Sequence, residues 1–120
     1  MNLGKTGTEG EKRVANYLRK KGFSVVKRNF LSKYGEIDII AQNEEYLIFV
    51  EVKTRKQGSM LSGIEAVDPF KQKRIILSAN DYIRKTESQL QPRFDIAEVT
   101  VFEKADGVLG YKLHYIENAW

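Results

Sequence analysis

The stretch from Gly35 to Thr54 constrains the fold of this chain more than any other stretch. It contains two runs rich in Ile, Val and Phe, residues 36–42 and 46–54, with a short polar break between them. Such runs around a polar break are typical of a β-hairpin. The simplest register pairs Gln42 with Leu47, Ile40 with Phe49, and Asp38 with Glu51. We therefore predict two antiparallel strands at the centre of the fold.

Both faces of this hairpin are apolar, and strands of that kind are normally buried on both sides. One face is predicted to hold Ile37, Ile39, Ala41, Ile48, Val50 and Val52. The other face carries Asp38, Glu51 and Lys53 among its apolar residues. Two opposed carboxylates about 5 Å apart repel by roughly 3 kcal/mol at an effective dielectric constant near 20. A bound cation is the natural compensation for that repulsion.

Oxygen ligands in this arrangement favour a hard divalent cation, Mg²⁺ or Mn²⁺. We predict that the carboxylates of Asp38 and Glu51 bind it, with the carbonyl oxygen of Val52 as a third ligand. Lys53 lies two residues beyond Glu51, where it can orient or deprotonate a water molecule. A metal ion that bridges a phosphate and that water would promote phosphodiester hydrolysis by in-line displacement.

Composition narrows the alternatives. With 120 residues, the chain is expected to form a single domain over residues 1–120. The absence of cysteine excludes disulfides, thiolate zinc sites and cysteine nucleophiles, and the single histidine excludes histidine-rich metal sites. No apolar run approaches 18 residues, so we expect no membrane insertion or secretion, and a cytoplasmic location.

Positive charge is concentrated in the part of the chain that contains the hairpin. Residues 1–85 hold 17 Lys and Arg against 10 Asp and Glu, a net charge of +7, whereas residues 86–120 hold 3 against 6, a net charge of −3. This asymmetry favours an anionic partner such as DNA, although a solvated lysine-rich surface gives the same pattern. The predicted phosphate contacts are Lys27, Arg28, Arg55, Lys56, Lys71 and Arg74.

The remaining elements follow from capping and periodicity. Thr8 and Glu11 fit a capping box at the start of a helix that ends near Gly22. Asp68 and Pro69 predict the start of a second helix that ends near Glu87. Strands are predicted over residues 23–30, 93–103 and 110–116, with a mobile loop over 55–63 and with His114 packed among apolar neighbours.

At Asp38 and the Glu51-Val52-Lys53 run, the chain resembles the PD-(D/E)XK nuclease superfamily. The resemblance narrows to the YraN family of bacterial proteins through the runs GEKRVANYLRKKGF, RNF, GEIDIIA, FVEVKTR, KQKR and RFDIA. It implies an α/β, restriction-endonuclease-like core: a central mixed sheet of about five strands flanked by helices, in the order helix, three-strand meander, helix, two strands. The YraN family is similar in fold to Holliday-junction resolvases, and this resemblance implies that the catalytic residues are Glu11, Asp38, Glu51, Lys53 and Gln72.

Three interpretations remain open at this point. The chain is a Mg²⁺-dependent endonuclease acting on DNA, with branched or junction DNA as the expected substrate and a homodimer as the expected assembly. Alternatively, it is a non-catalytic nucleic-acid-binding module that retains the nuclease fold. In the third interpretation Asp38, Glu51 and Lys53 form a buried ion-pair cluster without a ligand, although such clusters contribute little to stability.

Overall fold

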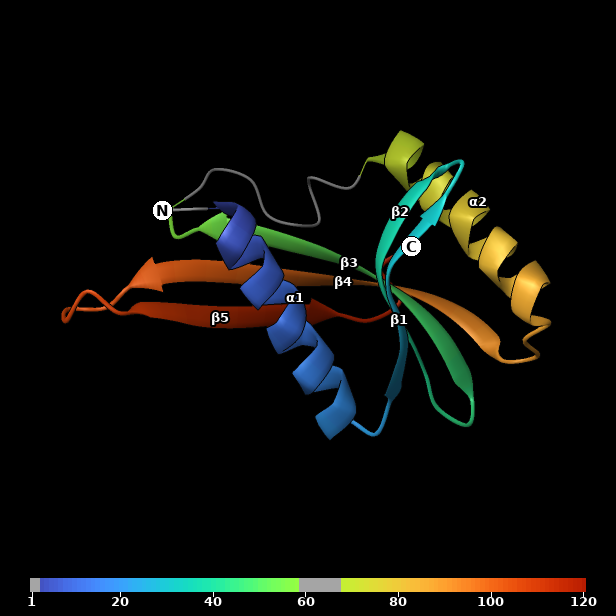
Figure 1. The fold of residues 1–120 in the computed structure, drawn as a ribbon, viewed down its shortest axis with the longest axis horizontal. Helices are drawn as coiled ribbons and strands as arrows, with labels where there is room; N and C mark the ends of the chain where they lie inside the picture. Colours follow the sequence, from blue (N-terminus) through green and yellow to red (C-terminus); the bar gives the residue numbers. More distant parts are fainter. Residues whose placement is uncertain (1–2, 59–67) are drawn as a thin grey trace.

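The computed structural model describes the backbone of residues 3–58 and 68–120 and the side chains from Thr8 onward, again without residues 59–67 (Figure 1). One mixed sheet contains five strands in the order β1-β2-β3-β4-β5, and one helix packs on each of its faces. The elements are α1 (Leu3–Lys20), β1 (Ser24–Ser32), β2 (Gly35–Gln42), β3 (Tyr46–Lys56), α2 (Pro69–Thr86), β4 (Gln91–Glu103) and β5 (Leu109–Ile116). The predicted α/β fold and order of elements are confirmed.

The central hairpin has the predicted register over part of its length. Gln42 pairs with Leu47 and Ile40 with Phe49, but the pairing of β2 with β3 ends at Ile39 and Val50. From there β3 continues to Lys56, supported on its other side by a parallel pairing with β4 that runs from Tyr46–Gln91 to Lys56–Val101. Arg55 and Lys56 therefore belong to a strand rather than to the predicted loop, whose residues 59–63 lie outside the described part of the chain.

Helix α1 covers one face of the sheet through Val14, Ala15 and Leu18, which are buried against β2, β3 and β4. It begins at Leu3, so Thr8 lies inside the helix and the predicted capping box is wrong. Gly4 and Gly7 are poor helix formers, but propensity is a weak preference that the tertiary context overrides. At Gly10 the helix approaches the sheet closely, because a Cβ there would lie 2.6 Å from Oγ1 of Thr54.

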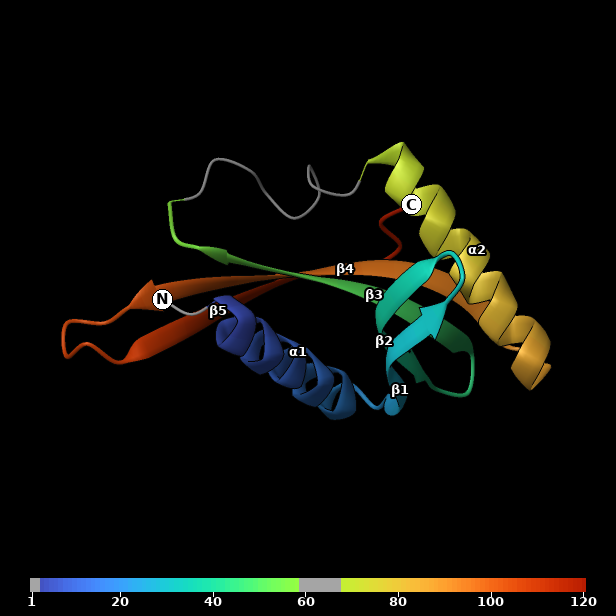
Figure 2. The same ribbon diagram turned by 45° about the horizontal axis from the view of Figure 1, so that its top comes forward.

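Helix α2 packs on the opposite face (Figure 2). Asp68 caps it by accepting a 2.8 Å hydrogen bond from the backbone N–H of Lys71, and Pro69 occupies the first turn, as predicted. Ile75 and Ala79 face a cluster that contains Phe30, Ile37, Ile40, Leu47, Phe49 and Ile96.

The alternation of faces predicts Ile37 on the same face as Ile39 and Ala41, and this prediction is wrong. Its side chain belongs to the α2 cluster, whereas Ile39 and Ala41 pack under α1. Before Ile39, over residues 35–38, β2 is not paired with β3, and together with β1 it curls toward α2 (Figures 1 and 2). Strict alternation of faces assumes a flat strand, and this strand is strongly twisted.

The C-terminal residues are fastened to the sheet at β4. Asp95 is fully buried, and its carboxylate accepts hydrogen bonds from the Arg93 guanidinium, the Tyr115 hydroxyl at 2.6 Å and the backbone N–H of Asn118 at 2.9 Å. Trp120 stacks on Phe94 with the ring centres 5.5 Å apart. A buried carboxylate is tolerated here because several donors satisfy it.

His114 is exposed on β5, so the prediction that it packs in the core is wrong. Over the described residues, neither α1 nor α2 has the length and apolar composition needed to cross a membrane.

Candidate active site

Asp38 lies just beyond the point where β2 leaves β3. Its Oδ2 accepts a 2.8 Å hydrogen bond from the backbone N–H of Val52. That N–H points to the edge of β3 that β2 no longer covers. The carboxylate of Asp38 therefore accepts the hydrogen bond that a backbone carbonyl of β2 would otherwise accept. The N–H and C=O of one strand residue point to the same edge. The carbonyl oxygen of Val52 therefore also faces the gap that contains Asp38, as a metal ligand there requires.

Glu51 is the most buried acid of the site, with 7% of its side chain exposed. Its Oε1 lies 2.7 Å from Nζ of Lys71 and 3.3 Å from Nζ of Lys53. Lys53 shares its strand, whereas Lys71 comes from the first turn of α2. Two ammonium groups from different elements thus neutralise one buried carboxylate. The sequence predicts Lys71 only as a phosphate contact, so its ion pair with Glu51 is a finding of the structure.

The protonation behaviour of these groups reflects their crowding. Burial, with the neighbouring charge of Glu51, raises the pKa of Asp38 to about 7. Burial also lowers the pKa of Lys53, and the hydrogen bond and positive charge of Lys71 lower it further. For Lys71, burial acts to lower the pKa, but hydrogen bonds to Glu51 and Lys53 outweigh it, so its pKa is raised. Lys53 is therefore the readier of the two lysines to lose a proton.

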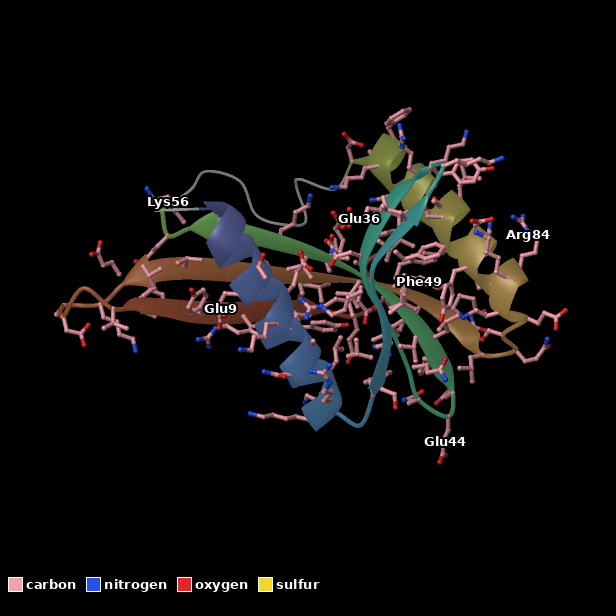
Figure 3. All side chains as sticks on the ribbon, viewed as in Figure 1. Glu9, Glu36, Glu44, Phe49, Lys56 and Arg84 are labelled. Atoms are coloured by element: carbon pink, nitrogen blue, oxygen red, sulfur yellow. The ribbon has the colours of Figure 1, made fainter. Side chains whose placement is uncertain are left out.

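A second group of side chains, from α1, β1 and β2, flanks Asp38. Nδ2 of Asn29 donates to Glu11 at 3.1 Å and to Glu36 at 2.8 Å, and Arg28 lies 3.7 Å from Glu11. The charges of both acids contribute to the raised pKa of Asp38, which places them beside it. Figure 3 shows Glu36 on β2, near the first turns of α2.

Asn29 and Glu36 are site residues that the sequence analysis did not identify. Glu36 carries a signal that could have found it, because it lies two positions before Asp38, and an alternation of faces predicts it on the same face of the strand. Asn29 has a positive φ of 52°, a backbone conformation that asparagine adopts more easily than most residues. That conformation is visible only in the structure.

The donor set fits a divalent cation held by few protein ligands. Among the described residues, no group of three or more Asp, Glu, His or Cys side chains is arranged to hold a metal ion. Asp38 and Glu51 are the two carboxylates that could serve as ligands, because the charge of Glu51 acts on Asp38 and the backbone of Val52 lies beside them. Mg²⁺ is commonly bound in this way, by one or two carboxylates with water and phosphate oxygens in the remaining positions.

The other predicted site residues lie on α2, β1 and β3. Gln72 is half-buried in the first turn of α2, next to Lys71. Nε of Arg74 donates a 2.8 Å hydrogen bond to the carbonyl oxygen of Tyr34, at the turn between β1 and β2. Lys27 is exposed on β1.

Arg55 and Lys56 lie further along β3. Arg55 forms a 3.0 Å ion pair with the buried Glu98 of β4. Lys56 is at the end of β3, well away from Glu36 in Figure 3. The structure thus gathers Glu11, Arg28, Asp38, Glu51, Val52, Lys53 and Lys71, and places Arg55 and Lys56 outside that group.

Comparison with known proteins identifies relatives over the full length of the chain. A sequence profile described as "Uncharacterised protein family UPF0102" matches residues 10–99. A UPF0102 protein of Caldanaerobacter subterraneus subsp. tengcongensis is 41% identical over 121 residues, covering 100% of this chain and 98% of the relative. A UPF0102 protein of Clostridioides difficile is 40% identical over 121 residues, covering 100% of both chains. The chain belongs to the uncharacterised protein family UPF0102, the YraN family that its sequence resembles.

Proposed function

We propose that this protein is a metal-dependent endonuclease that hydrolyses phosphodiester bonds in DNA. The observation that carries the proposal is the cluster at the break in the β2–β3 pairing. There the buried carboxylate of Glu51 and the half-buried carboxylate of Asp38 lie beside Lys53, an ammonium group with a lowered pKa. A buried cluster of perturbed charges is more often functional than structural.

Each residue has a distinct role in this proposal. Asp38, Glu51 and the Val52 carbonyl oxygen would hold Mg²⁺ or Mn²⁺, which when bound supplies Lewis acidity toward the phosphate. Lys53, in its neutral form, would accept a proton from the attacking water. Lys71 is placed to neutralise Glu51 in the absence of metal and to meet a phosphate oxygen in the complex. Asn29 would hold Glu11 and Glu36 in place beside Asp38.

DNA is the proposed substrate because the charge around the site favours a polyanion. Arg28, Lys71 and Arg74 lie on the elements that carry the acids or pack against them. Contacts of this kind make affinity fall steeply as the salt concentration rises. Branched DNA and a homodimer follow from the resemblance to junction resolvases, since a two-fold junction suits a two-fold protein.

The test is cleavage of a panel of four-way junction, flap, single-stranded and linear duplex DNAs with Mg²⁺ or Mn²⁺. The wild type should cleave at least one of them, and Lys53→Ala should lower the rate by about 10²-fold or more. Lys104→Ala is the matched control, because Lys104 lies in the turn between β4 and β5, and it should cleave like the wild type. Salt-dependent binding without cleavage of any substrate would instead identify a non-catalytic binding module.

A further inference from the structure

A groove of about 300 Å³ lies between α1 and β5. Its lining includes the apolar and aromatic groups of Tyr17, Tyr111 and Leu113, together with Arg13, Asn16 and Lys20 from α1. Residues two positions apart on a helix point about 200° apart. Arg13 therefore faces away from Glu11, so α1 presents one side to the acids of the candidate active site and another side to this groove.

Arg13 contacts both an aromatic ring of the groove and an acid of its own helix. Its Cζ lies 4.0 Å from the centre of the Tyr111 ring, and its Nε lies 3.4 Å from Oε1 of Glu9 one helical turn earlier. Figure 3 places Glu9 on α1, on the side that faces the β4–β5 end of the sheet. A guanidinium that lies over a ring in this way offers a flat, preorganised surface.

The tyrosine beside it is also held in place. The ring of Tyr17 packs against that of Tyr115 with the centres 4.9 Å apart, and Nζ of Lys21 lies 5.6 Å from the centre of the Tyr17 ring. Tyr17 and Tyr111 are both half-buried, so each keeps part of its surface accessible. The groove therefore combines rigid aromatic surface with open space.

The charged side chains that line the groove are cations, and the carboxylate of Glu9 pairs with one of them, Arg13, from outside the lining. The described side chains that line it include two cations, Arg13 and Lys20, and no carboxylate. Asn16 adds an amide whose Oδ1 already accepts a 3.1 Å hydrogen bond from Arg19, so its amide N–H groups are the part suited to a ligand acceptor. Aromatic rings with adjacent cations are the means by which proteins stack unpaired bases and hold their phosphates.

We propose that this groove binds one nucleotide of a single-stranded nucleic acid. The base stacks on the surface formed by Arg13, Tyr17 and Tyr111, and Lys20 pairs with the phosphate. This site is separate from the carboxylates and goes beyond the proposed nuclease function. It adds a place where an unpaired strand is held on the far side of α1.

The test is binding of an eight-nucleotide single-stranded DNA that carries one 2-aminopurine, in EDTA at fixed salt concentration. Anisotropy reports affinity, and quenching of the 2-aminopurine fluorescence reports stacking. Tyr111→Leu should weaken binding about tenfold and abolish the quenching, whereas Tyr111→Phe should retain both. Arg13→Met should weaken binding, and Lys104→Met, which removes a cation outside the groove, should bind like the wild type. Melting temperatures of all variants check that each is folded.

Equal affinity of the wild type and Tyr111→Leu, with quenching unchanged, would overturn the proposal. So would equally tight binding of an octaglutamate peptide, because it would show a site for negative charge without any recognition of bases. No divalent metal is present in the assay. A protein without nuclease activity can therefore still bind the single-stranded DNA in the groove, and an active nuclease can lack this binding. The result is therefore independent of the cleavage test.

Discussion

Nζ of Lys71 lies 2.7 Å from Oε1 of Glu51, closer than Lys53 at 3.3 Å, although Lys53 is on the same strand as Glu51. The first turn of α2 is thereby tied to the centre of β3. The contact also places a second ammonium group beside Lys53, with consequences for how Lys53 loses its proton.

Replacing Lys71 should change the pH dependence of cleavage. Lys71→Met removes the hydrogen bond and the positive charge that lower the pKa of Lys53, so the pKa of Lys53 should rise. Since neutral Lys53 is the proposed base, the acid limb of the pH–rate profile should move to higher pH. Single-turnover rates from pH 6 to pH 10 measure the shift. Lys73→Met, an exposed neighbour on α2, should leave the profile where it is. If both variants match the wild type, Lys71 does not tune Lys53.

Asp38→Asn should alter the pH dependence of stability in the absence of metal. The pKa of Asp38 is raised from 3.8 to about 7, so between these pH values the folded protein binds a proton that the unfolded chain does not. The free energy of unfolding of the wild type should therefore fall as the pH rises from about 4 to 7. At about 1.4 kcal/mol per pKa unit, the loss is on the order of 4 kcal/mol.

Asparagine cannot ionise but can still accept the hydrogen bond from Val52. The variant should therefore lack this loss and be more stable than the wild type at pH 8. Added Mg²⁺ or Mn²⁺ should raise the melting temperature of the wild type only. Urea denaturation at several pH values, with and without metal, measures both effects. A wild type that is insensitive to metal, together with a Lys53→Ala variant that unfolds, would favour a purely structural ion-pair cluster.

Two substitutions at Asn29 separate its backbone role from its side-chain role. Asn29→Gly keeps the left-handed backbone but removes the amide that bridges Glu11 and Glu36. Asn29→Ala removes the amide and also strains the backbone, by about 1–2 kcal/mol. Both should lower the cleavage rate by about 10–100-fold, as expected when a group that positions the acids around a metal site is lost. Only in Asn29→Ala should this backbone strain lower the free energy of unfolding, as measured by urea denaturation. Full activity of Asn29→Gly would show that the bridge has no part in catalysis.

Gly10→Ala tests the close approach of α1 to the sheet. Alanine in a helix interior normally stabilises by up to about 1 kcal/mol relative to glycine. Here the added Cβ would lie 2.6 Å from Oγ1 of Thr54, so the variant should gain nothing or lose stability. In the Thr54→Ala background the same substitution should be stabilising. Urea denaturation of the four proteins gives the coupling energy, which we expect to exceed about 0.5 kcal/mol. Additive effects would mean that Thr54 moves aside freely.

Local sequence signals predict those parts of the fold that depend on neighbouring residues. The register of Ile40 with Phe49 follows from the lengths of two apolar runs, and the start of α2 follows from Asp68 and Pro69. The start of α1 does not follow from local signals, because the packing of the whole helix outweighs the low helix propensity of the glycines in its first turns. The prediction for Ile37 is wrong because a strict alternation of faces takes no account of the twist of the strand. The ion pair of Lys71 with Glu51 depends on how α2 lies across the sheet. No local sequence pattern predicts that orientation.

The long parallel pairing of β3 with β4 sets an order for folding. It joins residues 45 positions apart, as in Tyr46 with Gln91, so it closes the chain over a large loop at a high cost in entropy. The antiparallel strands β1, β2 and β3 are joined by short turns and can pair early. Of the seven residues that the structure gathers at the candidate active site, six precede Thr54. Only Lys71 lies after the three strands β1, β2 and β3. We therefore expect the acids to be brought near one another before the lysine of α2 arrives to neutralise them, which makes the early intermediate sensitive to pH and to ionic strength.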